Sequence, residues 1–191
     1  MSTLKVDTIL KRTGTGTITV GQSGDTITIP SGATLNSAGT NTLEGIANTP
    51  AFLAQKPNSS QSISQDSTTK VTFTDEIYDS DGTYDTSNSR FTPGVAGKYC
   101  ISAQVGFENM SDAKYVQVYL YVNGSELNSR SMGLNVNGAD TTQDLFFNFT
   151  YTVNASATDY YEIYARQNNG NSRDTTKQQQ VYFQAYRILG A

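Results

Sequence analysis

The chain has 191 residues, a mass of 20.7 kDa and a formal net charge of -4 at pH 7, which suits one ordinary domain with a modest extension. Charged residues make up only 16% of the chain, so it lacks a basic surface that could neutralise nucleic-acid phosphates, and we expect no nucleic-acid partner. It contains no histidine, which excludes Ser-His-Asp and Cys-His catalysis and removes the commonest zinc ligand. We therefore expect neither an enzyme nor a cofactor.

The composition predicts an all-β protein, because Thr, Ser, Asn and Gly are abundant beside 12 Tyr and 8 Phe. No apolar run approaches the ~20 residues that cross a bilayer. The N-terminus also lacks the continuous apolar core of a secretory signal, so we expect cytoplasmic synthesis and no membrane insertion. Cys100 is the single cysteine, so no disulfide can form within the chain.

Residues 1–12, MSTLKVDTILKR, form a short first segment in which Leu4, Val6 and Ile9 alternate loosely with polar residues. A terminal segment of this length cannot make a hydrophobic core of its own. It is either a docking peptide that binds a larger partner or a frayed chain end, and the sequence leaves both interpretations open.

Residues 13–49 repeat short strand-like pieces, TGTITV and DTITIPSGATL, separated by glycine-containing turns. Each piece places two β-branched apolar residues on one side, Ile18 with Val20 and Ile27 with Ile29, and threonines on the other. So few apolar side chains cannot offset the entropy that is lost when a single chain is ordered. We expect a β-repeat stalk that is stable when several copies pack together, with a flexible Gly/Thr linker as the alternative.

Pro50 marks the start of a second region, residues 50–191, in which strand-like stretches follow one another at short spacing. Asn-Gly pairs at 123–124 and 137–138 predict tight hairpin turns. This length and this number of strands favour a two-sheet sandwich or jelly roll. The clearest strands are TKVTF, GKYCISAQVGF, KYVQVYLYVNG, DLFFNFTYTV, DYYEIYARQ and QVYFQAYRIL.

Two of these strands bear on assembly. In DLFFNFTYTV, one side carries an apolar residue at every second position from Leu145 to Val153, and this side is predicted to be core. In YVQVYLYV, valines and Leu120 lie on one side, but the other side is also largely apolar because it carries tyrosines. Tyrosine suits a surface that another protein buries while its edge stays wet, so this side predicts a subunit interface; burial of both sides within one subunit is the alternative. The expected interface residues are Tyr115, Tyr119 and Tyr121.

The acidic stretch TDEIYDSDGTYD is the one candidate for ion binding, because carboxylate oxygens at alternate positions can surround calcium. Its spacing departs from the helix-loop-helix calcium motif, and a solvated turn is the alternative. Cys100, in a predicted strand, is expected to be a small buried apolar residue. Paired carboxylates can cleave glycans, but this region is small for the extended groove that such an enzyme uses. The weak metal candidates are Asp79, Asp81 and Asp85.

The region from residue 51 to residue 191 resembles the globular head of complement component C1q and its tumour-necrosis-factor-like relatives. The similarity is carried by AFLAQK, by TYDTSNSRFTPGVAGKYC and by the closing VYFQAYRILGA. Its most specific part runs from Tyr84 to Tyr99. The matching positions are Ala51, Phe52, Tyr84, Asp85, Arg90, Phe91, Thr92, Gly97, Tyr99, Phe183 and Leu189.

This resemblance implies a ten-stranded jelly roll that assembles as a homotrimer around a threefold axis. Within the shared motif, the glycines of PGVAG permit a backbone reversal. Phe91 and Tyr99 are expected to anchor the two flanks of the reversal in the core. Arg90 is expected to pair with a carboxylate such as Asp85.

Residues 1–40 resemble the N-terminal part of fibre and appendage proteins of tailed bacteriophages. The resemblance is carried by MSTLKVDTI and by the Gly/Thr-rich TITVGQSGDTITIPSGATL that follows it. Together the two resemblances imply a structural virion protein made in the bacterial host cytoplasm. It would be a homotrimeric tail fibre or spike that docks to other virion proteins through Leu4, Val6 and Ile9 and contacts a host cell-surface glycan or protein through its head. A head-decoration, collar or tail-joint protein without receptor binding and a bacterial lectin-like binding module are the alternatives. Polar loops at the end of the head are expected to contact the receptor: Asn135, Asn137, Asp140, Asn169, Asn171 and Arg173.

Overall fold

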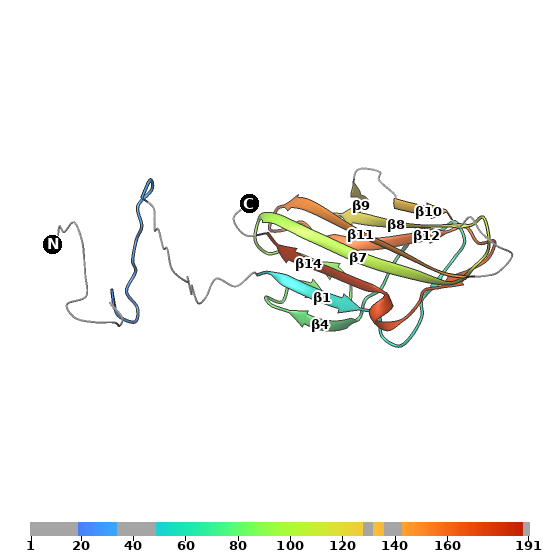
Figure 1. Cartoon of the computed structure of the whole chain (residues 1–191), viewed down its shortest axis with the longest axis horizontal. Coiled ribbons are helices and arrows are strands. Elements are labelled where there is room, and N and C mark those ends of the chain that lie inside the picture. Colours follow the sequence, from blue (N-terminus) through green and yellow to red (C-terminus); the bar gives the residue numbers. More distant parts are fainter. Residues whose placement is uncertain (1–18, 34–48, 128–131, 136–142, 189–191) are drawn as a thin grey trace, which may run out of the picture. The chain divides into compact units, whose positions relative to one another are not determined.

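The computed structural model describes residues 19–33, 49–127, 132–135 and 143–188 (Figure 1). The chain divides into two compact units, Met1–Glu44 and Gly45–Ala191. Leu4, Val6 and Ile9, with the rest of the expected docking peptide, lie outside the described residues.

In the first unit, residues 19–33 contain turns and no strand. One turn is closed by Asp25, whose carboxylate accepts a hydrogen bond of 2.7 Å from the backbone N–H of Gln22. The side chains of Val20, Ile27 and Ile29 are 62%, 60% and 48% exposed. These are the apolar side chains that a single copy of a β repeat would leave uncovered. The expected stalk requires several packed copies, so it stays a prediction.

In the second unit, the described residues form fourteen strands and one short 3-10 turn. Ten strands were expected; the larger number arises because six strands have only two residues each. Within the described residues, no helix is long and apolar enough to cross a membrane. The elements are β1 (Ala51–Gln55), β2 (Ser62–Ile63), β3 (Thr69–Lys70), β4 (Asp75–Asp79), β5 (Tyr84–Asp85), β6 (Arg90–Phe91), β7 (Gly97–Met110), β8 (Tyr115–Val122), β9 (Ser125–Glu126), β10 (Met132–Asn135), β11 (Gln143–Ala155), β12 (Tyr161–Gln167), β13 (Arg173–Asp174), η2 (Gln178–Gln180) and β14 (Tyr182–Arg187).

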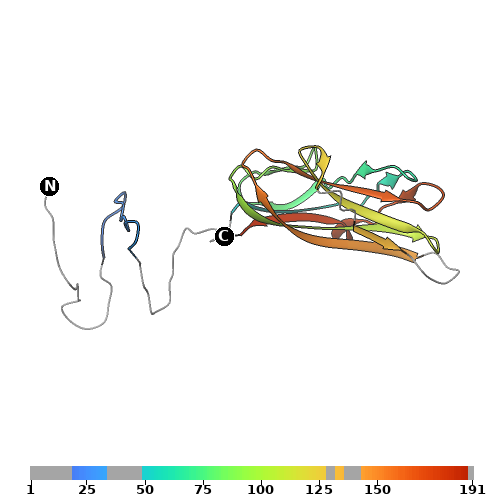
Figure 2. The ribbon, with the colours of Figure 1, turned by 90° about the horizontal axis from the view of Figure 1, so that it is seen from above.

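The strands form two packed sheets, which confirms the predicted sandwich (Figure 2). One sheet, here called the β7 sheet, has the strand order β11-β7-β14-β1-β4. The other, here called the β8 sheet, has the order β10-β8-β12-β6-β5, with β3 paired to β12 and β9 paired to β8. The pairings between these strands are antiparallel, and β13 pairs with β2 separately.

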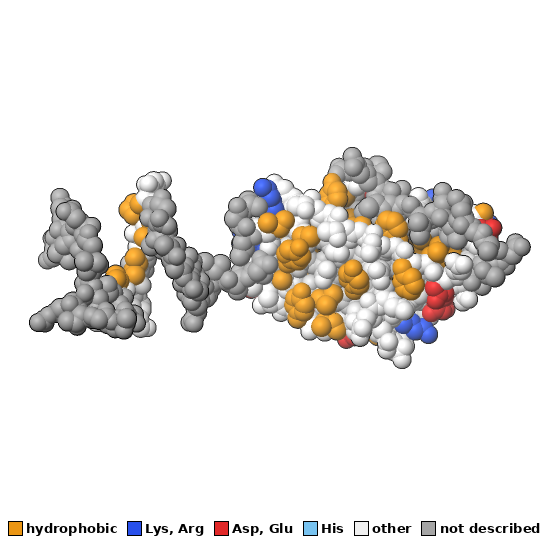
Figure 3. Space-filling view, in the orientation of Figure 1, with side chains coloured by type: hydrophobic (Ala, Val, Ile, Leu, Met, Phe, Trp, Pro, Cys, Tyr) orange, Lys and Arg blue, Asp and Glu red, His pale blue; other side chains and the backbone are white. Residues whose placement is uncertain are grey.

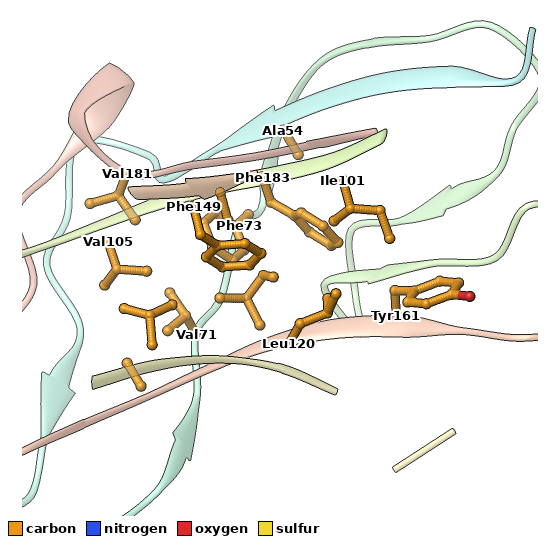
Figure 4. Close-up of a cluster of buried hydrophobic side chains, with 14 of the residues drawn as sticks. Ala54, Val71, Phe73, Ile101, Val105, Leu120, Phe149, Tyr161, Val181 and Phe183 are labelled. Atoms are coloured by element: carbon orange, nitrogen blue, oxygen red, sulfur yellow. The ribbon is translucent and has the colours of Figure 1, made fainter. Parts of the chain in front are cut away.

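The core lies between the two sheets because the strands alternate apolar and polar residues with period two. In β7, every second residue from Tyr99 to Phe107 is fully buried. Figure 4 shows Phe73, Phe149 and Phe183 clustered in this core. The expected core side of β11 is confirmed: Leu145, Phe149 and Val153 are buried, and Phe147 and Tyr151 are partly buried against the same cluster.

The backbone reversal before β7 is held as the sequence motif predicts. The expected anchors Phe91 and Tyr99 are both fully buried, with ring centroids 5.7 Å apart. The Tyr99 hydroxyl donates a hydrogen bond of 2.8 Å to the carbonyl of Val95, which ties the loop to the strand that follows it. Ser89 has a positive φ of 48°, and its buried hydroxyl accepts a hydrogen bond of 2.9 Å from the N–H of Phe73.

The chain enters and leaves the head at the same end. Near the start of β7, the N–H of Ile188 donates to the carbonyl of Lys98 at 2.8 Å, and the N–H of Arg187 donates to the carbonyl of Pro50 at 3.1 Å. We call this the proximal end. With a rise of about 3.3 Å per residue, β7 carries the chain about 40 Å to its last residue, Met110, at the opposite, distal end.

Candidate interaction surfaces

The outward side of the β7 sheet exposes large apolar side chains. Phe52, Ile101 and Phe183 point into the core, so their neighbours along β1, β7 and β14 point outward. Tyr78 is 47% exposed and Tyr186 is 41% exposed. Figure 3 shows hydrophobic side chains distributed over this part of the head. We call this surface the β7-sheet face, and it consists of Leu53, Tyr78, Cys100, Phe146, Tyr182 and Tyr186.

The middle of the β7-sheet face carries no charged residue on its longest strand. Between Lys98 and Glu108, the outward residues of β7 are Cys100, Ser102, Gln104 and Gly106. A side chain at Gly106 would place its Cβ 2.6 Å from the Phe146 ring, so glycine lets that ring lie directly over the strand. Depletion of charge around exposed aromatic rings is typical of the buried centre of a protein interface.

The tyrosine side of β8 is only partly open, because its own subunit buries Tyr119. Tyr119 is only 7% exposed, and its hydroxyl donates a hydrogen bond of 2.8 Å to the Gln117 side chain. Tyr121 stacks on Tyr164 of β12 with ring centroids 3.9 Å apart, and Tyr115 is half-buried. Tyr119 is therefore buried within its own subunit, as the alternative interpretation of this strand expected. It has almost no surface left for a partner. This corrects the expectation that it contributes to a trimer interface.

A buried carboxylate lies beside these tyrosines. Glu162 is 2% exposed and is contacted by two cations, Lys70 Nζ at 3.2 Å and Arg90 Nη2 at 2.9 Å. The Arg90 guanidinium also lies over the Tyr160 ring, 3.8 Å from its centroid. The expectation that Arg90 pairs with a carboxylate is confirmed, but the partner is Glu162 on β12, 72 residues further along the chain, and not Asp85, the example that the sequence suggested.

The acidic turn uses its carboxylates to close loops. Asp79 accepts hydrogen bonds from the N–H of Tyr84 at 2.7 Å and from the Thr83 hydroxyl at 3.1 Å. Asp85 accepts hydrogen bonds from the side chains of Ser87 and Asn88, which lower its pKa to about 2. Among the described residues, no three His, Cys, Asp or Glu side chains come together to hold a metal ion, so the structure does not unite Asp79, Asp81 and Asp85.

Cys100 differs from its expected position in the core. It is half-buried and lies on the β7-sheet face, where Tyr186 is its register partner on β14. A hydrogen bond with Cys100 raises the pKa of the Tyr186 hydroxyl. The inward neighbours Tyr99 and Ile101 occupy the core positions that flank it.

The predicted receptor loops meet at the distal end, but not all of their residues are accessible. Asn169 is 6% exposed, and its side-chain oxygen accepts a hydrogen bond of 2.7 Å from the N–H of Ser111, so it holds two loops together and is not available to a receptor. Asn171 is exposed and Arg173 is half-buried. The backbone of Asn135 pairs with that of Tyr115 at the same end, while Asn137 and Asp140 lie outside the described residues.

Two polar hollows at the distal end share one residue, Glu108, which sequence reasoning missed. The larger hollow has a volume of about 380 Å³ and the smaller one about 230 Å³. Arg173 was among the residues predicted to contact a receptor, but Glu108 lies within a long strand and carries no sequence signal of its own. The larger hollow is lined by Asn58, Glu108, Lys177, Gln178, Gln179 and Gln180; the smaller by Glu108, Asn109, Ser172, Arg173 and Asp174.

Comparison with known sequences gives one informative similarity. No protein-family model matches the chain. The chain is 32% identical over 111 residues to the phage-like element PBSX protein XkdV of Bacillus subtilis strain 168. The aligned part covers 56% of this chain and 16% of that protein, so the chain spans only a small part of the relative's length.

Comparison with solved structures concerns the head. The globular domain of zebrafish complement 1qA protein matches 73% of this chain and 98% of its own chain, with a TM-score of 0.53 and 17% identity. The Eiger TNF of S. frugiperda matches 75% of this chain and 96% of its own, with a TM-score of 0.52 and 11% identity. The expected fold is confirmed: the head is an all-β jelly roll of the C1q and TNF type.

Proposed function

We propose that the chain is a structural protein of a phage or phage-like particle, in which the jelly-roll head forms the exposed end of a homotrimeric tail fibre or spike. The observation that carries the proposal is the 32% identity to a protein of a phage-like element. The role of the protein is structural and adhesive: residues 1–12 dock to other virion proteins, residues 13–49 form the stalk, and the head contacts the host surface.

The β7-sheet face supports the trimeric part of the proposal. Its uncharged centre and its half-exposed rings, including Tyr78 and Tyr186, resemble an interface core more than an ordinary monomer surface. A second copy of the same chain supplies a matching apolar surface, and closed cyclic symmetry satisfies every copy equally. Three copies agree with what is typical of this fold. The stalk segment also supports assembly from several copies, because a single copy leaves Val20, Ile27 and Ile29 exposed.

The placement of the chain ends supports the adhesive part of the proposal. Because Pro50 enters the head at the proximal end, Asn171 and Arg173 lie at the end of the head opposite to this entry point. Three such ends on one fibre would multiply weak contacts, so even millimolar affinity of one head becomes useful through avidity.

Antibody labelling of intact particles tests this function. Antibodies against residues 51–191 are added to particles of the phage or phage-like element that encodes the chain, and gold labels are located by electron microscopy. We expect labels at tail-fibre or spike ends, and we expect monovalent antibody fragments to reduce adsorption to host cells. Heads that are accessible only after particle disruption would favour the architectural alternative, and particles that contain none of the protein would overturn the proposal.

A further inference from the structure

The distal hollows contain side chains that do not hold the fold together. The three ion pairs among the described residues use Lys70, Arg90 and Arg166 as their cations, and none of them involves Glu108 or Lys177. Glu108 projects outward from β7 at a half-buried position between the two hollows. A carboxylate at this position is free to accept hydrogen bonds from a ligand.

The lining of the hollows has the chemistry that recognises hydroxyl groups. Five amide side chains and the Ser172 hydroxyl supply both donors and acceptors, and a sugar hydroxyl is likewise both a donor and an acceptor. The carboxylates of Glu108 and Asp174 are balanced by the cations of Lys177 and Arg173. The site therefore has no net charge with which to attract a polyanion or a cation, which favours an uncharged ligand.

Unpaired buried polar atoms gather in the same part of the chain. Among the described residues, four buried side-chain nitrogen or oxygen atoms lack a hydrogen-bond partner, and three of them belong to Asn169, Arg173 and Thr176. Such atoms are costly and call for a partner. Arg173 lines the smaller hollow, and its buried Nε has no hydrogen-bond partner within the chain.

The sizes of the hollows limit the ligand. At about 380 and 230 Å³ they lie near the lower limit of small-molecule pockets, about 300 Å³. Each hollow suits a short piece of a linear molecule, and the shared Glu108 lets one molecule occupy both.

We propose that the distal hollows bind neighbouring uncharged sugar units of a host-surface glycan, with Glu108 accepting hydrogen bonds from hydroxyl groups between them. This inference rests on the proposed contact of the head with the host surface and names the class of molecule that is contacted. The amides of Gln178, Gln179 and Asn109 fix the orientation of the sugar units on the two sides of Glu108.

The test uses the fluorescently labelled full-length chain on an array of immobilised maltotriose, cellotriose, mannotriose and chitotriose, with oligogalacturonate as the anionic comparison. The variants Glu108→Gln and Lys177→Ala alter the larger hollow. The control variants Lys98→Ala, at the proximal end, and Thr152→Ala, at an exposed position of β11, change residues that line neither hollow. We expect at least one uncharged oligosaccharide to bind, Glu108→Gln to weaken it about tenfold, and the controls to bind as the unmodified chain does.

Binding of the same labelled proteins to host cells separates this inference from the proposed function. Unchanged oligosaccharide binding by both hollow variants would overturn the assigned site. Preference for oligogalacturonate, or cell binding without binding to any sugar on the array, would overturn the assigned ligand class while the host-contact function stands. Absence of binding to both cells and sugars would overturn the host-contact function and the inference together.

Discussion

Tyr186 of β14 and Cys100 of β7 are register partners on the outward side of one sheet, where Tyr186 is 41% exposed. Both lie on the β7-sheet face, which the proposed trimer buries. A charge at this position should therefore separate the subunits without disturbing the core. We expect Tyr186→Asp to raise the dissociation constant of the assembly about tenfold or more, because the added carboxylate is desolvated without a partner.

Light scattering over a dilution series measures this change. Ser125→Asp, at an exposed position of β9 in the β8 sheet, adds the same charge on the other sheet and serves as the control. Equal dissociation constants for both variants would remove the β7-sheet face from the interface.

The reactivity of Cys100 should report on the same contact. Its thiol is half-buried in the single chain, and a partner on the β7-sheet face would cover it further. We expect a maleimide to modify Cys100 slowly in the native assembly and faster in Tyr186→Asp, as followed by mass spectrometry. Equal modification rates in the two proteins would show that the thiol is not covered by a partner.

Removal of the Glu162 carboxylate should destabilise the head. Glu162 is 2% exposed and neutralises Lys70 and Arg90, whose side chains are 30% and 34% exposed. Glu162→Ala leaves two partly buried cations without their counter-charge, so we expect the free energy of unfolding to fall by about 2 to 3 kcal/mol. Urea unfolding at fixed protein concentration measures the loss.

The matched control for Glu162→Ala is Arg166→Ala. Its ion pair with Asp66 has side-chain exposures of 34% and 46%, so water and salt screen it and we expect a much smaller loss of stability. Similar losses of stability in the two variants would contradict the structural role assigned to Glu162.

Because of Lys56, the free energy of unfolding of the head should rise as the pH increases from 8 to 9.5. Burial lowers the pKa of Lys56 to about 8, whereas the unfolded chain keeps the ordinary value of 10.5. Above pH 8 the unfolded state therefore binds more protons than the folded state, and stability rises with pH; below pH 8 both states are charged and this gain is lost. We expect a gain of about 1 to 2 kcal/mol between pH 8 and 9.5.

Comparison with Lys56→Met isolates this contribution. The measurement stops at pH 9.5 because tyrosines of the unfolded chain begin to ionise above it, while burial raises the pKa of Tyr161 to about 12 in the fold. An equal pH dependence in the unmodified chain and in the variant would show that Lys56 keeps its ordinary pKa.

The parts of the fold that are local in sequence could be predicted. The alternation in β11 identified Leu145, Phe149 and Val153 as core, and the motif around Phe91 and Tyr99 identified the loop that they anchor. Both signals depend on residues a few positions apart, where the period of a strand and the preferences of a turn apply directly.

The parts that depend on strand pairing could not be predicted. Whether Tyr119 is covered depends on β12, which follows β8 by about forty residues, and the partner of Arg90 lies on the same distant strand. Burial of Asn169 likewise depends on Ser111, 58 residues away. Glu108 was missed for the same reason, since the larger hollow forms where β7 meets segments near residues 58 and 177, and the smaller one where β7 meets residues 172–174.

The solution mass of the purified full-length chain tests the central claim most directly. Light scattering after size exclusion is expected to give a trimer, three times 20.7 kDa or about 62 kDa, for the unmodified protein. A shortened chain that starts at Ala51 should give a trimer as well, because the β7-sheet face lies entirely within the head. A mass of 20.7 kDa for the full-length chain at all concentrations would contradict the account of a self-assembling fibre head.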